Sequence, residues 1–179
     1  MGQFVFSHLS ETEKTLPYYL IGVGCDWEQE DIERPFGYPY FQWIQTIRGE
    51  GLLTLGGTEF RVPTQHGMFL YPEEEHSYHA RDGEWTVHWF TFGGYHISSL
   101  LQLIDLRSSG VYPVASPHPV ETVVRRRVVV KCDLDALGIA VILKQVTERP
   151  ANVEQAPESV DLLEGVEDTL KRLLDLGIV

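Results

Sequence analysis

Residues 51–62 read GLLTLGGTEFRV, and the fold prediction starts from this stretch. Two short segments that are expected to be strands, Gly51–Leu55 and Thr58–Val62, flank the dipeptide Gly56-Gly57. Because glycine adopts the positive φ angles of a tight primed turn at little cost, the stretch predicts a β-hairpin. It lies within a region from Tyr18 to Phe92 that is rich in aromatic residues, β-branched residues and glycines, with turn signals about every ten residues. That spacing is typical of a β-sandwich or a β-barrel.

The residue pattern changes on both sides of this region. Residues 1–17 are polar and mixed, and we expect an arm with one short strand at 4–6. Residues 96–106 have helical periodicity, residues 107–119 are expected to form a loop, and residues 133–148 and 158–176 again predict helices. The last helix carries an apolar seam of Leu163, Val166, Leu170 and Leu173, which fits a subunit interface and docking on the barrel equally well.

Charge and length restrict the class of function. The chain has 179 residues, enough for one domain with a core, and a net charge of −12, which disfavours direct binding to DNA phosphates. No apolar run is long enough to span a bilayer and no signal peptide is visible, so we expect a cytoplasmic protein with no membrane partner. Cys25 and Cys132 are then expected to be reduced thiols.

The most informative polar residue in the barrel region is Arg34. In a strand predicted over Asp26–Arg34, alternation places Glu28, Glu30, Ile32 and Arg34 on one face. If that face is the barrel interior, Arg34 needs a partner, because an unpaired buried charge is costly. Either Glu30 pairs with it, or the guanidinium binds a carboxylate, a phosphate or two vicinal hydroxyls of a ligand.

Two further strands offer groups for the same pocket. In the strand predicted over 40–47, one face carries Tyr40, Gln42, Ile44 and Thr46. The other face carries Phe41, Trp43, Gln45 and Ile47 and could pack under the helices. Trp89 shares a face with Trp85 and Val87, and its ring is either core or a stacking surface for a sugar. Tyr78 places a phenol near the mouth of the barrel. Together these residues indicate a pocket for a small polar ligand.

The histidines do not predict a metal centre. No His-x-His pair occurs in the chain, and His76 and His79 would point to opposite sides of a strand. No nucleophile elbow, P-loop or dinucleotide fingerprint is present. We therefore expect no metal, no cofactor and no catalytic residues.

Five short motifs in this region resemble the N-terminal ligand-binding, cupin-like domain of AraC-type bacterial transcription regulators. They are Arg34-Pro35-x-Gly37, Ile47-Arg48-Gly49-x-Gly51, the run from Gly67 to Pro72, His76-x-Tyr78 and Trp85-x-x-x-Trp89-x-x-Phe92. The resemblance covers about half of the chain, from Tyr18 to about Leu106. It implies a mainly β fold: a cupin-like (jelly-roll) β-barrel at 18–94, after the arm at 1–17, followed by two or three α-helices within a dimerisation region at 95–179.

The resemblance also implies a function. Arg34, Tyr78 and Trp89 would contact a sugar, with Ile32, Gln42 and Thr46 lining the same pocket. The N-terminal arm would either close over the ligand or touch the DNA-binding part. The protein would be a homodimer and an effector sensor, without enzymatic activity, that acts on DNA only through a helix-turn-helix portion missing from this chain. The alternatives are a cupin-type enzyme, such as a metal-dependent sugar isomerase or oxygenase, and a plain dimerisation module with a filled barrel.

Overall fold

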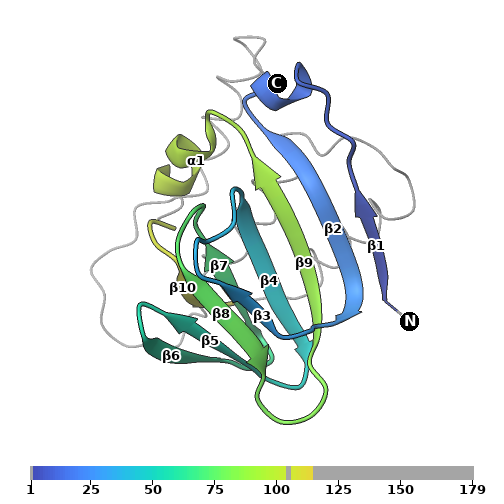
Figure 1. Cartoon of the computed structure of the whole chain (residues 1–179), viewed down its shortest axis with the longest axis vertical. Helices are drawn as coiled ribbons and strands as arrows, with labels where there is room; N and C mark the ends of the chain where they lie inside the picture. Colours follow the sequence, from blue (N-terminus) through green and yellow to red (C-terminus); the bar gives the residue numbers. More distant parts are fainter. Residues whose placement is uncertain (1, 104–105, 115–179) are drawn as a thin grey trace, which may run out of the picture.

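A computed structural model describes residues 2–103 and 106–114. Within them, ten strands form two antiparallel sheets that face each other (Figure 1). The six-stranded sheet has the order β1-β2-β9-β4-β7-β10 and the four-stranded sheet the order β3-β8-β5-β6. The strands are β1 Gln3–Phe6, β2 Tyr19–Glu28, β3 Ile32–Arg34, β4 Phe41–Arg48, β5 Gly51–Leu55, β6 Thr58–Val62, β7 His66–Leu70, β8 His76–Ala80, β9 Thr86–Gly93 and β10 Gly110–Pro113.

The predicted hairpin is confirmed. Strands β5 and β6 pair from Gly51↔Val62 to Leu55↔Thr58, and Gly56 and Gly57 have φ angles of 53° and 77°. Both angles lie in the region that side chains with a Cβ disfavour, so the two glycines explain the tight turn. The expected strand at 4–6 is also present, as β1, which pairs with β2.

The single strand predicted over Asp26–Arg34 is wrong. β2 ends at Glu28 in the six-stranded sheet, and β3 begins at Ile32 in the four-stranded sheet. Asp26 has a φ of 50° beside a register shift between β2 and β9, and the chain then crosses from one sheet to the other over residues 29–31. Alternation therefore does not continue from Glu28 to Arg34, because the two segments belong to different sheets.

The region expected to be a loop at 107–119 contains a strand in its described part. β10 pairs antiparallel with the edge of β7, from Gly110↔Phe69 to Pro113↔His66. Its position at the end of the sheet suits Pro113, which lacks a backbone N–H for a further neighbour. The helix expected at 96–106 is present as α1, Ile97–Leu103. A short 3₁₀ turn, Glu13–Thr15, is the remaining helical element of the described residues, and the helices predicted at 133–148 and 158–176 lie outside them.

Two apolar clusters hold the domain together. One lies between the sheets and contains Ile44, Leu53, Val62, Met68, Leu70, Tyr78, Trp85 and Val87. The other covers the opposite face of the six-stranded sheet, where Trp43, Phe69, Phe90 and Phe92 pack with Ile97 and Leu101 of α1. The alternation predicted for β4 is confirmed by this division, since Trp43 lies in one cluster and Ile44 in the other.

None of the helical segments that the structure describes has the length and apolar character needed to cross a bilayer.

Candidate ligand pocket between the two sheets

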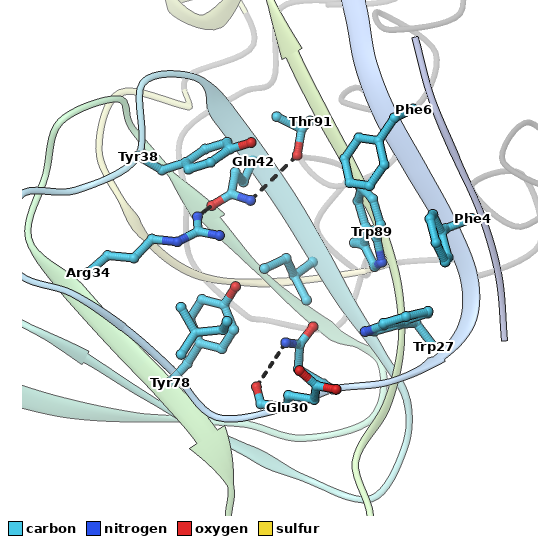
Figure 2. Close-up of a pocket in the computed structure, with 13 residues that line it drawn as sticks. Phe4, Phe6, Trp27, Glu30, Arg34, Tyr38, Gln42, Tyr78, Trp89 and Thr91 are labelled. Atoms are coloured by element: carbon cyan, nitrogen blue, oxygen red, sulfur yellow. Dashed lines mark hydrogen bonds between the residues drawn. The ribbon is translucent and has the colours of Figure 1, made fainter. Parts of the chain in front are cut away.

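A cavity of about 220 Å³ opens between the two sheets (Figure 2). Its volume falls below the range of roughly 300–1,000 Å³ that is usual for drug-sized ligands, so it suits a smaller molecule. Strands of both sheets, the 29–31 crossing and the N-terminal strand β1 all contribute to its wall. The lining residues are Phe4, Phe6, Trp27, Gln29, Glu30, Ile32, Arg34, Tyr38, Gln42, Ile44, Tyr78, Trp89 and Thr91.

Six of the seven candidate residues from the sequence line this cavity: Arg34, Tyr78, Trp89, Gln42, Ile32 and Glu30. The seventh, Thr46, is buried on the same face of β4 as Gln42, but it does not line the cavity. Its Oγ1 donates a hydrogen bond to the Val62 carbonyl oxygen (2.8 Å) and accepts one from Trp85 Nε1 (2.9 Å). Thr46 therefore links β4 to Val62 and Trp85 in the core instead of lining the cavity, because the Trp85 side chain fills the space between the sheets beside Thr46.

Arg34 is half-buried and has neutral partners. Its Nη1 donates a hydrogen bond to Gln42 Oε1, and its guanidinium carbon lies 4.0 Å from the centre of the Tyr38 ring. The pair with Glu30 considered from the sequence is not formed, and no other carboxylate of the described segments lies within 4.0 Å of the guanidinium. The reason is the sheet crossing, which places Glu30 at the exposed rim of the cavity.

Gln42 links Arg34 to the neighbouring strand. Its amide oxygen accepts the hydrogen bond from Arg34, and its Nε2 donates to Thr91 Oγ1 at 3.4 Å (Figure 2). Both side chains are buried, and β4 and β9 pair at these two positions. The Thr91 hydroxyl thus accepts from Gln42 and retains its own hydrogen for donation to a ligand.

Tyr78 reaches the cavity from β8 and is 3% exposed. Burial raises the pKa of the phenol to about 12, although the nearby Arg34 charge acts in the opposite direction. The group is therefore a neutral phenol at physiological pH and can donate its hydrogen. Its ring meets the ring of Trp85 edge-on, with centroids 6.1 Å apart, which positions the phenol against the core.

The opposite side of the cavity is aromatic. Phe4, Phe6, Trp27 and Trp89 lie together across from Arg34 (Figure 2). The Trp89 ring packs directly over β2, since a Cβ added at Gly24 would meet Trp89 Nε1 at 2.2 Å. Phe6 contacts Trp89 with ring centroids 5.6 Å apart, and Phe4 contacts Trp27 edge-on at 5.2 Å. The glycines of β2 make room for this aromatic wall.

Six lining residues were not identified from the sequence: Phe4, Phe6, Trp27, Gln29, Tyr38 and Thr91. Ile44, which the sequence placed on the face of Gln42, also lines the cavity. Thr91 had an available signal, since it follows Trp89 at the two-residue spacing of one strand face. For Phe4 and Phe6, the sequence showed only that the two rings share a strand face. It did not show that they reach the cavity, because the pairing of β1 with β2 is a tertiary contact.

The histidines are arranged as the strand alternation predicts. His76 is buried and His79 is exposed on the same strand, β8. Burial lowers the pKa of His76, whose Nδ1 lies 2.7 Å from the carbonyl oxygen of Glu74. Within residues 2–103 and 106–114, no three His, Cys, Asp or Glu side chains come together in a group that could hold a metal ion.

Two facing antiparallel sheets with a small cavity, one cation and an aromatic wall between them have the features of a small-molecule site. Its family model is the AraC-like ligand binding domain, which matches residues 12–132. The chain therefore belongs to the AraC-like ligand binding domain family, as the sequence motifs predicted.

Other comparisons give more distant likenesses. A cupin superfamily protein from Desulfitobacterium hafniense is 11% identical, with 51% of this chain and 76% of that chain covered and a TM-score of 0.33. The Cnp3 cupin domain of Schizosaccharomyces pombe is 12% identical, with 56% and 70% covered and a TM-score of 0.36. An HTH_3 family transcriptional regulator from Vibrio cholerae is 11% identical, with 49% and 47% covered and a TM-score of 0.34. Among curated proteins, the sequence has no significant match.

Proposed function

We propose that this domain senses a small polar effector, such as a sugar, and transmits its binding to a DNA-binding portion outside these 179 residues. The observation that carries the proposal is the convergence of Arg34, Tyr78 and Trp89 on one cavity, from three different strands. The membership of the chain in the AraC-like ligand binding domain family supports a role in transcription regulation. We extend the proposal to a cytoplasmic location.

Each of the three residues has a distinct role in this proposal. The guanidinium of Arg34 hydrogen-bonds ligand oxygens, because it presents several N–H groups in a fixed fork. The ring of Trp89 packs against the C–H face of the ligand, and the Tyr78 phenol donates a hydrogen bond from the opposite sheet. Gln42, Ile32 and Glu30 complete the wall.

The N-terminal strand provides a route for transmission. Phe4 and Phe6 of β1 form part of the pocket wall, and β1 is an edge strand of four residues that pairs only with β2 in the described sheet. A ligand that touches these two rings binds the docked arm better than the undocked arm, and so shifts the population toward the docked state. We extend the proposal to a homodimer whose activity depends on this equilibrium.

Calorimetric titration with a panel of monosaccharides, supported by thermal shift, tests the proposal. At least one compound should bind and raise the melting temperature, because a ligand of the folded state stabilises it. Arg34→Ala should reduce the affinity at least tenfold while the circular dichroism spectrum stays unchanged. Arg48→Ala is the matched control, since Arg48 is exposed and absent from the pocket wall. Undiminished binding by Arg34→Ala would contradict the assignment.

A further inference from the structure

The pocket wall contains a cation with no anionic partner among the described residues. One N–H group of Arg34 donates a hydrogen bond to the neutral amide oxygen of Gln42, and the Tyr38 ring covers one face of the guanidinium. A guanidinium has five N–H donors and no acceptor, so most of its hydrogen-bonding capacity is left for a ligand or water. A half-buried cation in this condition favours an anionic partner.

The other buried polar groups of the cavity wall are neutral. The Gln42 oxygen is already used by Arg34, and the Thr91 hydroxyl already accepts from Gln42. The Tyr78 hydroxyl makes no hydrogen bond with the described residues and carries its proton at neutral pH. The one carboxylate of the wall belongs to Glu30, an exposed residue. The buried part of the wall therefore holds one cation and no anion, which favours a ligand that carries a negative charge over a neutral one.

The aromatic wall restricts the rest of the ligand. Phe4, Phe6, Trp27 and Trp89 lie across the cavity from Arg34 (Figure 2). These side chains favour a flat or C–H-rich surface over a second charge. A cavity of about 220 Å³ favours a ligand smaller than the drug-sized molecules that larger pockets hold.

We propose that the effector is a small ring-bearing carboxylic acid, with its carboxylate on the Arg34 guanidinium and the Tyr78 hydroxyl and its ring against Trp89. This inference rests on the proposed sensing function and specifies the chemical class of the effector. A uronic acid and an aromatic acid share this chemistry. They differ in whether ring hydroxyls remain to bind Glu30 at the rim, and the experiment separates them.

Matched pairs of acid and neutral compound form the test. Wild-type protein is titrated calorimetrically with glucuronate and glucose, galacturonate and galactose, and benzoate and benzyl alcohol at neutral pH. The acid of at least one pair should bind at least tenfold more tightly than its neutral partner. Preference for the uronates identifies a sugar acid, and preference for benzoate identifies an aromatic acid.

Two variants locate the selectivity. Arg34→Lys keeps the charge but loses the planar fork, and should weaken acid binding at least tenfold. Tyr78→Phe removes one donor and should weaken acid binding by a smaller factor. Arg48→Lys is the surface control and should bind like the wild type, and urea unfolding of each variant establishes that the fold persists.

The outcomes separate this inference from the proposed function. If a neutral compound binds as tightly as its acid partner, or more tightly, the acid inference is overturned while sensing of a small molecule stands. If no compound of these pairs or of the monosaccharide panel binds, both are overturned. Acid binding that Arg34→Lys leaves unchanged also refutes the placement of the carboxylate on Arg34.

Discussion

Replacement of Thr46 by valine tests whether this residue belongs to the core or to the ligand pocket. Valine keeps the β-branched shape and removes the hydroxyl. In the structure that hydroxyl accepts a hydrogen bond from Trp85 Nε1 at 2.9 Å and donates one to the Val62 carbonyl at 2.8 Å, with Thr46 only 2% exposed. The substitution therefore leaves one indole N–H and one carbonyl without their buried partner.

The expected magnitude follows from these two groups. Each buried polar group that loses its partner costs roughly 1–3 kcal/mol, with the carbonyl at the lower end because its oxygen has a second lone pair. We expect Thr46→Val to lower the free energy of unfolding by about 2–4 kcal/mol. For a chain of this length that corresponds to a fall of about 4 °C or more in Tm. Effector affinity, measured below the transition, should remain within a factor of two, because Thr46 lies outside the cavity.

Urea unfolding followed by tryptophan fluorescence is the assay, with midpoint and slope fitted for each variant. Thr91→Val is the matched control, since Thr91 is also 2% exposed on a strand of the same sheet but takes part in only one long hydrogen bond, at 3.4 Å. Thr91→Val should therefore be the milder change in stability and the stronger one in effector binding. The reasoning is refuted if Thr46→Val unfolds within about 0.5 kcal/mol of the wild type, or if it is the variant that loses effector binding.

Two further predictions concern the aromatic wall and pH. Gly24→Ala places a Cβ 2.2 Å from Trp89 Nε1, so the Trp89 ring must move and effector affinity should fall at least tenfold in a calorimetric titration. Gly110→Ala, where the nearest atom is 3.7 Å away, should leave the affinity unchanged, and equal affinities for both variants would contradict the packing described. For His76, burial lowers the pKa in the folded state below its ordinary value of 6.5. Below pH 6.5 the unfolded chain therefore binds more protons than the folded chain, and the protein loses stability as the pH falls toward the folded pKa. His76→Gln should reduce the change in the urea unfolding midpoint between pH 7.5 and pH 5. A pH dependence parallel to that of the wild type would show that His76 does not contribute to the loss of stability at low pH.

The local features of the fold were predictable from the sequence, because they depend on neighbours along the chain. Gly56-Gly57 identified the β5–β6 hairpin through the φ angles that the turn requires. Strand alternation correctly separated Ile44 from Trp43 and placed Trp89 on the pocket face. The motifs around Arg34, Tyr78 and Trp89 were sufficient to identify the family.

The partners of those residues were decided by the tertiary structure. Alternation placed Thr46 correctly on the face of Gln42, but the depth of the cavity depends on Trp85, which closes the interior and binds the Thr46 hydroxyl. Glu30 is near Arg34 in sequence, yet the crossing between sheets leaves Arg34 bonded to Gln42 instead. Phe4 and Phe6 enter the wall only because β1 pairs with β2.

The amino-acid sequence by itself determined which side chains share a face within one strand, because a strand alternates its faces with a period of two. It did not determine where a strand ends, as the break between Glu28 and Ile32 shows. Whether an inward side chain meets a cavity, a hydrogen-bond partner or another ring depends on the opposite sheet. That sheet is assembled from segments far apart in the chain, and only their packing leaves space beside Arg34 and none beside Thr46.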